Sequence, residues 1–126
     1  ESPDGFLPLD ELGFGATVAA ADPPLLDRLR TALPGALVGD VLTVSTVTGT
    51  AGSAATLAAR HPDALAEAME GFGVACAAAG AGLPFAELRT VSNPIGPRDR
   101  AGWRIPDALA ALTAAARAFA PLAASS

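Results

Sequence analysis

Residues 36–47 constrain the fold most, because they are rich in β-branched residues and apolar on both faces around residues 41–44. A strand with apolar side chains on both faces suits a sheet that is buried on both sides, as in α/β proteins. The segment therefore predicts a buried strand within an α/β fold.

Proline residues divide the rest of the chain into segments with helical periodicity. Asp22 before Pro23 and Pro24 predicts a helix start, since aspartate caps helices and proline suits their first turn. Leucines then recur at helical spacing until Pro34 ends the run. The sequence therefore predicts a helix directly before the first strand.

The same signals predict three further helices and two further strands. We expect helices over residues 51–60, 69–79 and 106–120, and strands over residues 64–68 and 85–92. The last helix should end before Pro121. Helices that alternate with strands favour an α/β layered domain. Because the strands are few for a complete sheet, we expect part of the sheet to be missing from this chain.

The composition indicates one small globular domain. The chain has 126 residues, of which 51% are hydrophobic and 17% charged, so it is not a disordered sequence. Its formal net charge is −5, with no basic stripe of the kind that binds nucleic acid. No apolar run reaches the roughly 18 residues of a membrane span. We therefore expect neither nucleic acid nor a membrane as a partner.

Cysteine content and motifs bear on location and cofactors. Cys76 is the single cysteine, so an internal disulfide is impossible, which fits a reducing cytosol and a cytoplasmic location. Residues 1–12 begin with polar, turn-rich sequence, which predicts a loop or flexible lead-in and not a signal peptide. The chain has no P-loop glycines, no serine elbow and no zinc-spaced Cys and His cluster. We therefore predict no metal and no cofactor.

Two polar residues are candidate site residues. Glu70 lies among small and apolar neighbours, where an ionised carboxylate is costly unless donors satisfy it. Asn93 ends a predicted strand, and open α/β sheets bind ligands beyond the carboxyl ends of their strands. The alternatives are a solvent-facing helix residue for Glu70 and an ordinary Asn-Pro turn for Asn93.

Two loops carry further candidates. Residues 45–50 follow the first strand with hydroxyl side chains and a glycine. That pattern suits either a plain strand-to-loop transition or a loop that offers backbone groups to a ligand. Arg98, Asp99 and Arg100 place three charges just before Trp103, which commonly indicates a solvated loop with local ion pairs.

Three stretches together resemble the superfamily of purine nucleoside phosphorylases and methylthioadenosine nucleosidases. Residues 68–75 (AMEGFGVA) resemble its Met-Glu helix start, residues 87–93 (ELRTVSN) the following strand, and residues 44–50 (VSTVTGT) the earlier strand with its base-binding loop. Residues 91–100 (VSNPIGPRDR), followed by Trp103, resemble the futalosine hydrolases in particular. Those enzymes cleave futalosine to hypoxanthine and dehypoxanthine futalosine in menaquinone biosynthesis.

The resemblance implies a three-layer nucleoside phosphorylase-like fold with a mixed central sheet, of which residues 1–126 form the carboxyl-terminal part of one domain. It implies an N-glycosidase that acts on a small-molecule nucleoside and assembles as a homo-oligomer. The amino-terminal half of the same domain is a further expected partner, because it should supply the water-activating acid. A purine nucleoside phosphorylase or another purine nucleosidase is the nearest alternative, and a non-catalytic binding or assembly fragment is the second.

The resemblance also implies roles for individual residues. Asn93 would hold the departing base and Glu70 the ribose hydroxyls, so these two are the expected catalytic residues. The expected substrate-binding residues are Met69 against the ribose, Val47 and Thr48 around the base, Phe72 in the helix motif, and Arg98 and Arg100. Either arginine is expected to bind the carboxylate of the benzoate-type group of futalosine.

Asn93 departs from the nucleosidases that act on adenine, which carry Asp at this position. An amide both donates and accepts hydrogen bonds, so it can pair with the carbonyl and the ring N–H of a 6-oxopurine. Asn93 therefore predicts hypoxanthine or guanine as the base. Ala68 is a second departure, because the family often carries an acidic residue just before the methionine. This departure is expected to remove only a supporting contact.

Overall fold

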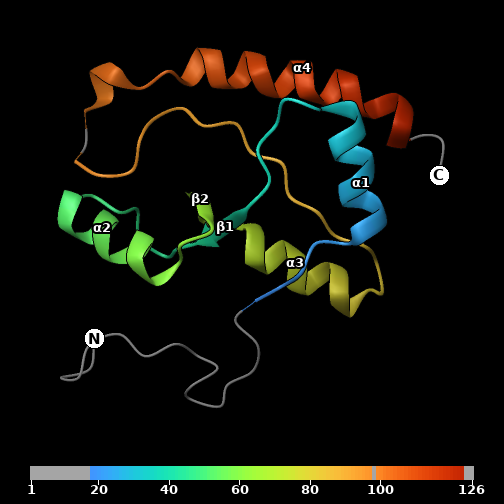
Figure 1. The fold of residues 1–126 in the computed structure, drawn as a ribbon, viewed down its shortest axis with the longest axis horizontal. Helices are drawn as coiled ribbons and strands as arrows, with labels where there is room; N and C mark the ends of the chain where they lie inside the picture. Colours follow the sequence, from blue (N-terminus) through green and yellow to red (C-terminus); the bar gives the residue numbers. More distant parts are fainter. Residues whose placement is uncertain (1–17, 98, 124–126) are drawn as a thin grey trace.

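The computed structural model describes residues 18–97 and 99–123, which form helices and a small parallel sheet (Figure 1). The elements in chain order are α1 (Pro23–Ala32), β1 (Asp40–Thr43), α2 (Ala51–Arg60), β2 (Ala64–Ala68), α3 (Gly71–Gly80), the 3-10 turn η1 (Arg100–Gly102) and α4 (Ile105–Ala123). In these ranges no helix has both the length and the apolar character needed to span a membrane. The expected α/β class is confirmed, whereas the three-layer arrangement with a mixed sheet stays a prediction.

The starts of α1 and α2 agree with the sequence because their end signals are local. Asp22 accepts a hydrogen bond from the N–H of Leu25 at 3.0 Å, so its carboxylate caps α1. Thr50 caps α2 in the same way, through the N–H of Ser53 at 3.1 Å. Each cap satisfies a backbone donor that has no partner inside its own helix.

Two helix boundaries differ from the prediction. α3 begins at Gly71 and not at Met69, because Glu70 has a non-helical backbone with φ −121° and ψ −16°. Met69 and Glu70 therefore lie in the junction that follows the carboxyl end of β2. α4 contains Pro121, which the sequence predicts beyond the helix end. Pro121 lacks the N–H that would bond the carbonyl four residues earlier, so it costs the helix one hydrogen bond near the end of the described residues.

β1 and β2 run parallel, with Thr43 opposite Ala68 at their carboxyl ends. The backbone pairing extends one residue further, because the N–H of Val44 donates to the carbonyl of Ala68 at 2.8 Å. β1 is shorter than the strand predicted over residues 36–47, and its two central residues are only half-buried. The expectation of a strand buried on both faces is therefore wrong for the described residues, since a two-stranded sheet covers too little of it.

Residues 85–92 form no strand, which contradicts the prediction for this segment. Loop contacts hold its two ends instead. The N–H of Asp22 donates to the carbonyl of Phe85, and the N–H of Arg104 donates to that of Ser92, both at 2.7 Å. Figure 1 shows the segment running as a coil beneath α4. A strand exists only through hydrogen bonds to a neighbouring strand, and none of the described strands pairs with this segment.

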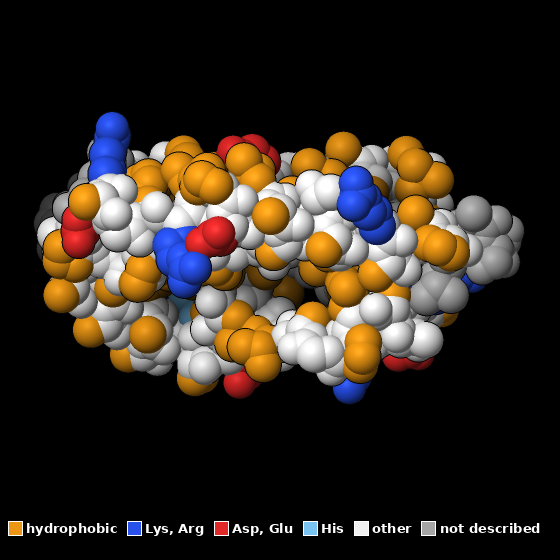
Figure 2. Space-filling model, turned by 90° about the horizontal axis from the view of Figure 1, so that it is seen from above, with side chains coloured by type: hydrophobic (Ala, Val, Ile, Leu, Met, Phe, Trp, Pro, Cys, Tyr) orange, Lys and Arg blue, Asp and Glu red, His pale blue; other side chains and the backbone are white. Residues whose placement is uncertain are grey.

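The described residues enclose little apolar surface. Ala75 and Ala115 are the buried hydrophobic residues among them, and Figure 2 shows hydrophobic side chains over much of one face. Leu37 is 83% exposed and Leu83 is 62% exposed. Full burial of a leucine side chain stabilises a protein by about 1.5–3 kcal/mol. This surface therefore favours a larger fold or assembly in which these side chains are covered.

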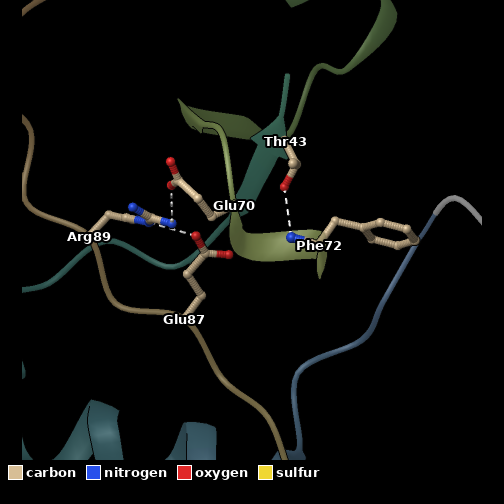
Figure 3. Close-up of polar contacts among 5 residues, drawn as sticks. All are labelled: Thr43, Glu70, Phe72, Glu87 and Arg89. Atoms are coloured by element: carbon tan, nitrogen blue, oxygen red, sulfur yellow. Dashed lines mark hydrogen bonds and ion pairs between the residues drawn. The ribbon is translucent and has the colours of Figure 1, made fainter. Parts of the chain in front are cut away.

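Thr43 joins the end of β1 to the start of α3. Its hydroxyl accepts a hydrogen bond from the N–H of Phe72 at 2.9 Å (Figure 3). Thr43→Val removes the acceptor and should lower the free energy of unfolding by about 1 kcal/mol, the scale of a lost helix cap. Thr43→Ser keeps the hydroxyl and should retain most of the stability in the same urea titration. Equal losses for the two variants would contradict the capping role.

Candidate functional site

A pocket of about 350 Å³ opens beside the carboxyl ends of β1 and β2. Its walls come from the loop after β1, from β2 with the junction that follows it, and from the coil after α3. Its lining includes Val44, Val47, Thr48, Glu67, Met69, Arg89, Asn93 and Trp103. Because open α/β sheets bind ligands beyond the carboxyl ends of their strands, this position favours a binding site.

The pocket brings together four of the residues that the sequence analysis selected, which are Val47, Thr48, Met69 and Asn93. They come from three stretches that are far apart in the chain. Met69 is 48% exposed and Val47 is 41% exposed, so both leave apolar surface for contact with a ligand. The four residues therefore line one pocket, while their roles as site residues stay predictions.

Asn93 is half-buried, and its amide already makes two local hydrogen bonds. Its Oδ1 accepts from the hydroxyl of Ser92 at 2.6 Å, and its Nδ2 donates to the carbonyl of Pro94 at 3.0 Å. An amide offers two donor hydrogens and two acceptor lone pairs. One donor and one acceptor are therefore left, and they match a ligand that presents a carbonyl and an N–H.

Glu70 occupies the cap position of α3, but its carboxylate makes no capping hydrogen bond. Its side chain is 73% exposed, and Oε2 lies 4.0 Å from a terminal nitrogen of Arg89 (Figure 3). Such an exposed ion pair contributes little to stability. Glu70 does not line the pocket, whereas Arg89 does, so the arginine connects this carboxylate to the pocket wall.

Glu87 and Arg89 form a second, closer ion pair that the sequence analysis missed. The Nε of Arg89 donates to Oε1 of Glu87 at 2.6 Å, and the Glu87 side chain is only 18% exposed. The two residues are two positions apart in the coil that follows α3, close enough in the chain for their side chains to meet. The spacing of an acidic and a basic residue two positions apart was the sequence signal that could have indicated this ion pair. The pair fixes Arg89 between Glu87 and Glu70, as Figure 3 shows.

Thr48 is held by Glu67, a second acidic residue that the sequence analysis missed. The Thr48 N–H donates to Oε1 of Glu67 at 2.9 Å, and the Thr48 hydroxyl donates to Oε2 at 2.7 Å. Glu67 is half-buried within β2. A glutamate inside a short strand of alanine and leucine was the signal for it, because acidic residues are uncommon in strands.

The remaining predicted site residues lie elsewhere. Phe72 is half-buried, does not line the pocket, and in Figure 3 points away from Glu70 and Arg89. Arg100 is exposed and lies 5.8 Å from the ring centre of Trp103, which lines the pocket. Arg98 lies outside the described residues. Within the two described ranges, no cluster of three or more His, Cys, Asp or Glu residues could hold a metal ion.

The chain is similar to three futalosine hydrolases. It is 62% identical over 122 residues to that of Streptomyces coelicolor, which covers 97% of this chain and 52% of the relative. It is 53% identical over 112 residues to that of Acidothermus cellulolyticus, covering 86% and 46%. It is 44% identical over 96 residues to that of Thermus thermophilus, covering 76% and 42%. No family model and no solved structure matches the chain.

The chain thus spans about half the length of the curated relatives that it matches. The resemblance to futalosine hydrolases, predicted from residues 91–100 and Trp103, is confirmed over nearly all of this chain. That the matched half is the carboxyl-terminal one stays a prediction.

Gly71 gives a direct test of the packing beside Glu70. A Cβ at this position would lie 2.5 Å from Oε2 of Glu87 and 2.6 Å from Oε1. Gly71→Ala should therefore displace the Glu87 carboxylate, and because this is the far end of a flexible side chain the free energy of unfolding should fall by no more than about 1 kcal/mol, the scale of a weakened ion pair with Arg89. The measurement is urea unfolding of the variant beside the unchanged protein.

Gly73→Ala is the matched control, because it lies in the same helix and a Cβ there meets nothing within 4 Å. This variant should be neutral or more stable, since alanine has the higher helix propensity by about 1 kcal/mol. If both glycine variants behave alike, the close approach of Glu87 to Gly71 does not matter for stability.

Proposed function

We propose that this chain forms about half of an N-glycosidase that hydrolyses futalosine to hypoxanthine and dehypoxanthine futalosine in menaquinone biosynthesis. The observation that carries the proposal is the pocket at the strand ends, where Thr48, Met69 and Asn93 converge. These residues come from the stretches that resemble the base-binding loop, the Met-Glu helix start and the purine-contacting strand of nucleosidases. The similarity to futalosine hydrolases supports the same substrate.

The base side of the reaction would depend on Asn93. Cleavage of a ribosyl bond develops positive charge on the sugar, as in other glycoside hydrolyses, and negative charge on the departing purine. Preorganised donors placed where that charge develops lower the barrier. Asn93 has one donor and one acceptor left beyond its bonds to Ser92 and Pro94. It would use both to hold a 6-oxopurine as it leaves.

The ribose side would depend on Glu70 and Met69. Because the Glu70 carboxylate is exposed and makes no capping bond, its oxygens can accept hydrogen bonds from the ribose hydroxyls. Its negative charge would also stabilise the cationic sugar of the transition state. Met69 would pack on the apolar face of the sugar, and Val47 would contact the base from the loop after β1.

We further propose that an amino-terminal half of the same domain completes the site and supplies the acid that activates water. Exposed hydrophobic residues such as Leu37, Leu83 and Val91 support a covering partner of this kind. The unpaired coil over residues 85–92 would gain a strand partner in the complete three-layer fold with its mixed sheet. We also propose that the complete enzyme is a homo-oligomer located in the cytoplasm.

Asn93→Asp tests the base side in the full-length polypeptide that carries this chain. The unchanged enzyme should release hypoxanthine from futalosine without phosphate and act poorly on the 6-amino analogue. Asp cannot donate, so the variant should lose about 100-fold or more on futalosine and gain preference for the analogue, because unmatched polar groups discriminate strongly. The measurement is chromatography of the free base from the two substrates.

Two results would count against this assignment. An unchanged preference in Asn93→Asp would remove Asn93 from base selection. An absolute requirement for phosphate in the unchanged enzyme would make it a phosphorylase.

Arg100 is proposed to bind the carboxylate of the benzoate-type group of futalosine. The guanidinium lies over Trp103 at the pocket wall and is exposed, so it can meet an anion there. Arg100→Ala should raise KM for futalosine by about 10-fold, the scale of a lost charge-assisted hydrogen bond. Inosine lacks the carboxylate, so its cleavage should change little in the same steady-state assay.

Arg104→Ala is the matched control, because it removes the same charge from a nearby residue that is already paired with Asp107 at 2.6 Å. It should leave the ratio of futalosine to inosine cleavage unchanged. Equal losses on both substrates in Arg100→Ala would refute the proposed contact.

A further inference from the structure

The loop between β1 and α2 forms one wall of the pocket, and its two ends are held by regular structure. At its start the N–H of Val44 bonds the carbonyl of Ala68 at 2.8 Å, which continues the pairing of the two strands. At its end Thr50 caps α2 through the N–H of Ser53 at 3.1 Å. The position of the wall between these ends depends on what holds the middle of the loop.

Glu67 holds the middle of the loop at two points. Its Oε1 accepts from the backbone N–H of Thr48 at 2.9 Å, and its Oε2 accepts from the Thr48 hydroxyl at 2.7 Å. Both bonds are partly buried, and both have an ionised acceptor, which makes them stronger than bonds between neutral groups. One carboxylate therefore fixes both the backbone and the side chain of a single loop residue.

Glu67 is an unusual residue for its position. It lies inside β2 between Ala66 and Ala68, opposite Leu42 of β1. Glutamate is depleted in strands, and a half-buried carboxylate needs donors to satisfy it. A residue with low propensity for its local structure often occurs at a functional site.

The two bonds also restrict what Thr48 can offer to a ligand. Its N–H and its hydroxyl hydrogen both point to Glu67, so neither is available as a donor in the pocket. The free groups of Thr48 are then oxygen lone pairs, on its hydroxyl and its carbonyl. Lone pairs suit the N–H groups of a purine ring.

We propose that Glu67 is a positioning residue that locks Thr48, and with it Val47, into a base-binding wall that presents hydrogen-bond acceptors. The inference rests on the proposed function, because it assigns the base to this side of the pocket. Although Glu67 lines the pocket, both of its carboxylate oxygens are engaged by Thr48, so its proposed role is to hold the loop and not to bind the substrate. It acts by fixing the loop before the base arrives, which preorganises the wall.

Glu67→Gln in the full-length polypeptide tests the inference. The amide keeps one acceptor oxygen, and its NH2 group faces the other Thr48 donor, so the two-point hold is lost. KM for futalosine and Kd for free hypoxanthine should each rise by about 10-fold, while kcat changes less, because ground-state binding of the base is affected. Hydrogen exchange at the Thr48 amide should become at least about 10-fold faster.

Asp27→Asn is the matched control, because it makes the same acid-to-amide change on an exposed residue of α1 outside the pocket, and it should retain near-normal KM, Kd and Thr48 exchange. If Glu67→Gln lowers Tm but leaves both KM and the hypoxanthine Kd unchanged, Glu67 has only a structural role and the inference is overturned. If the unchanged enzyme does not cleave futalosine, the proposed function fails and the hypoxanthine titration decides alone. Weaker binding in Glu67→Gln then supports the inference, and equal or absent binding in both proteins contradicts it.

Discussion

The parallel pairing of β1 with β2 is the constraint on which the rest of the site depends. Parallel strands bring their carboxyl ends to one edge of a sheet, and here the pairing continues to the bond between Val44 and Ala68. The loop that carries Thr48 and the junction that carries Met69 and Glu70 therefore start from the same edge. This pairing therefore brings the stretches at residues 44–50 and 68–75 to the same pocket.

Two carboxylates near this edge differ in how many hydrogen bonds the chain itself makes to them. Glu67 is half-buried, and both of its oxygens bond to Thr48 at 2.9 and 2.7 Å. Glu70 is exposed, and its approach to Arg89 at 4.0 Å is an ion pair of about 0–1 kcal/mol at most. The Glu67 carboxylate is therefore engaged by hydrogen bonds within the chain, whereas the Glu70 oxygens are accessible to a ligand.

Local signals in the sequence were sufficient for the starts of α1 and α2 and for β2, but not for the start of α3 or for the place of Pro121 in α4. Asp22 with the prolines after it, and Thr50 before α2, are caps that act within one turn, so the start of each helix could be predicted. The strand predicted over residues 85–92 was wrong because strand formation depends on a distant neighbour, and the described residues supply none. Composition and β-branched content alone carry no information about that neighbour.

Only part of the site was predicted, because the sequence does not show contacts between residues that are distant in the chain. Resemblance to known motifs selected Met69, Thr48 and Asn93, which converge on the pocket. It did not find Glu67 or Arg89, because their importance lies in contacts across the fold: Glu67 with a loop 19 positions earlier, and Arg89 beside the start of α3. Analysis of separate sequence segments identifies residue types. The importance of Glu67 and Arg89 depends on contacts with residues elsewhere in the fold, which such segments do not show.

Under the proposed function, the complete enzyme transfers the ribosyl group of a 6-oxopurine nucleoside to water in this pocket. The most direct measurement is mass spectrometry of the sugar product formed from futalosine in water labelled with oxygen-18, with phosphate present in excess. We expect hypoxanthine to be released and the label to appear in the new hydroxyl group of the sugar. An unlabelled sugar phosphate, or no release of base from futalosine, would contradict the proposed function.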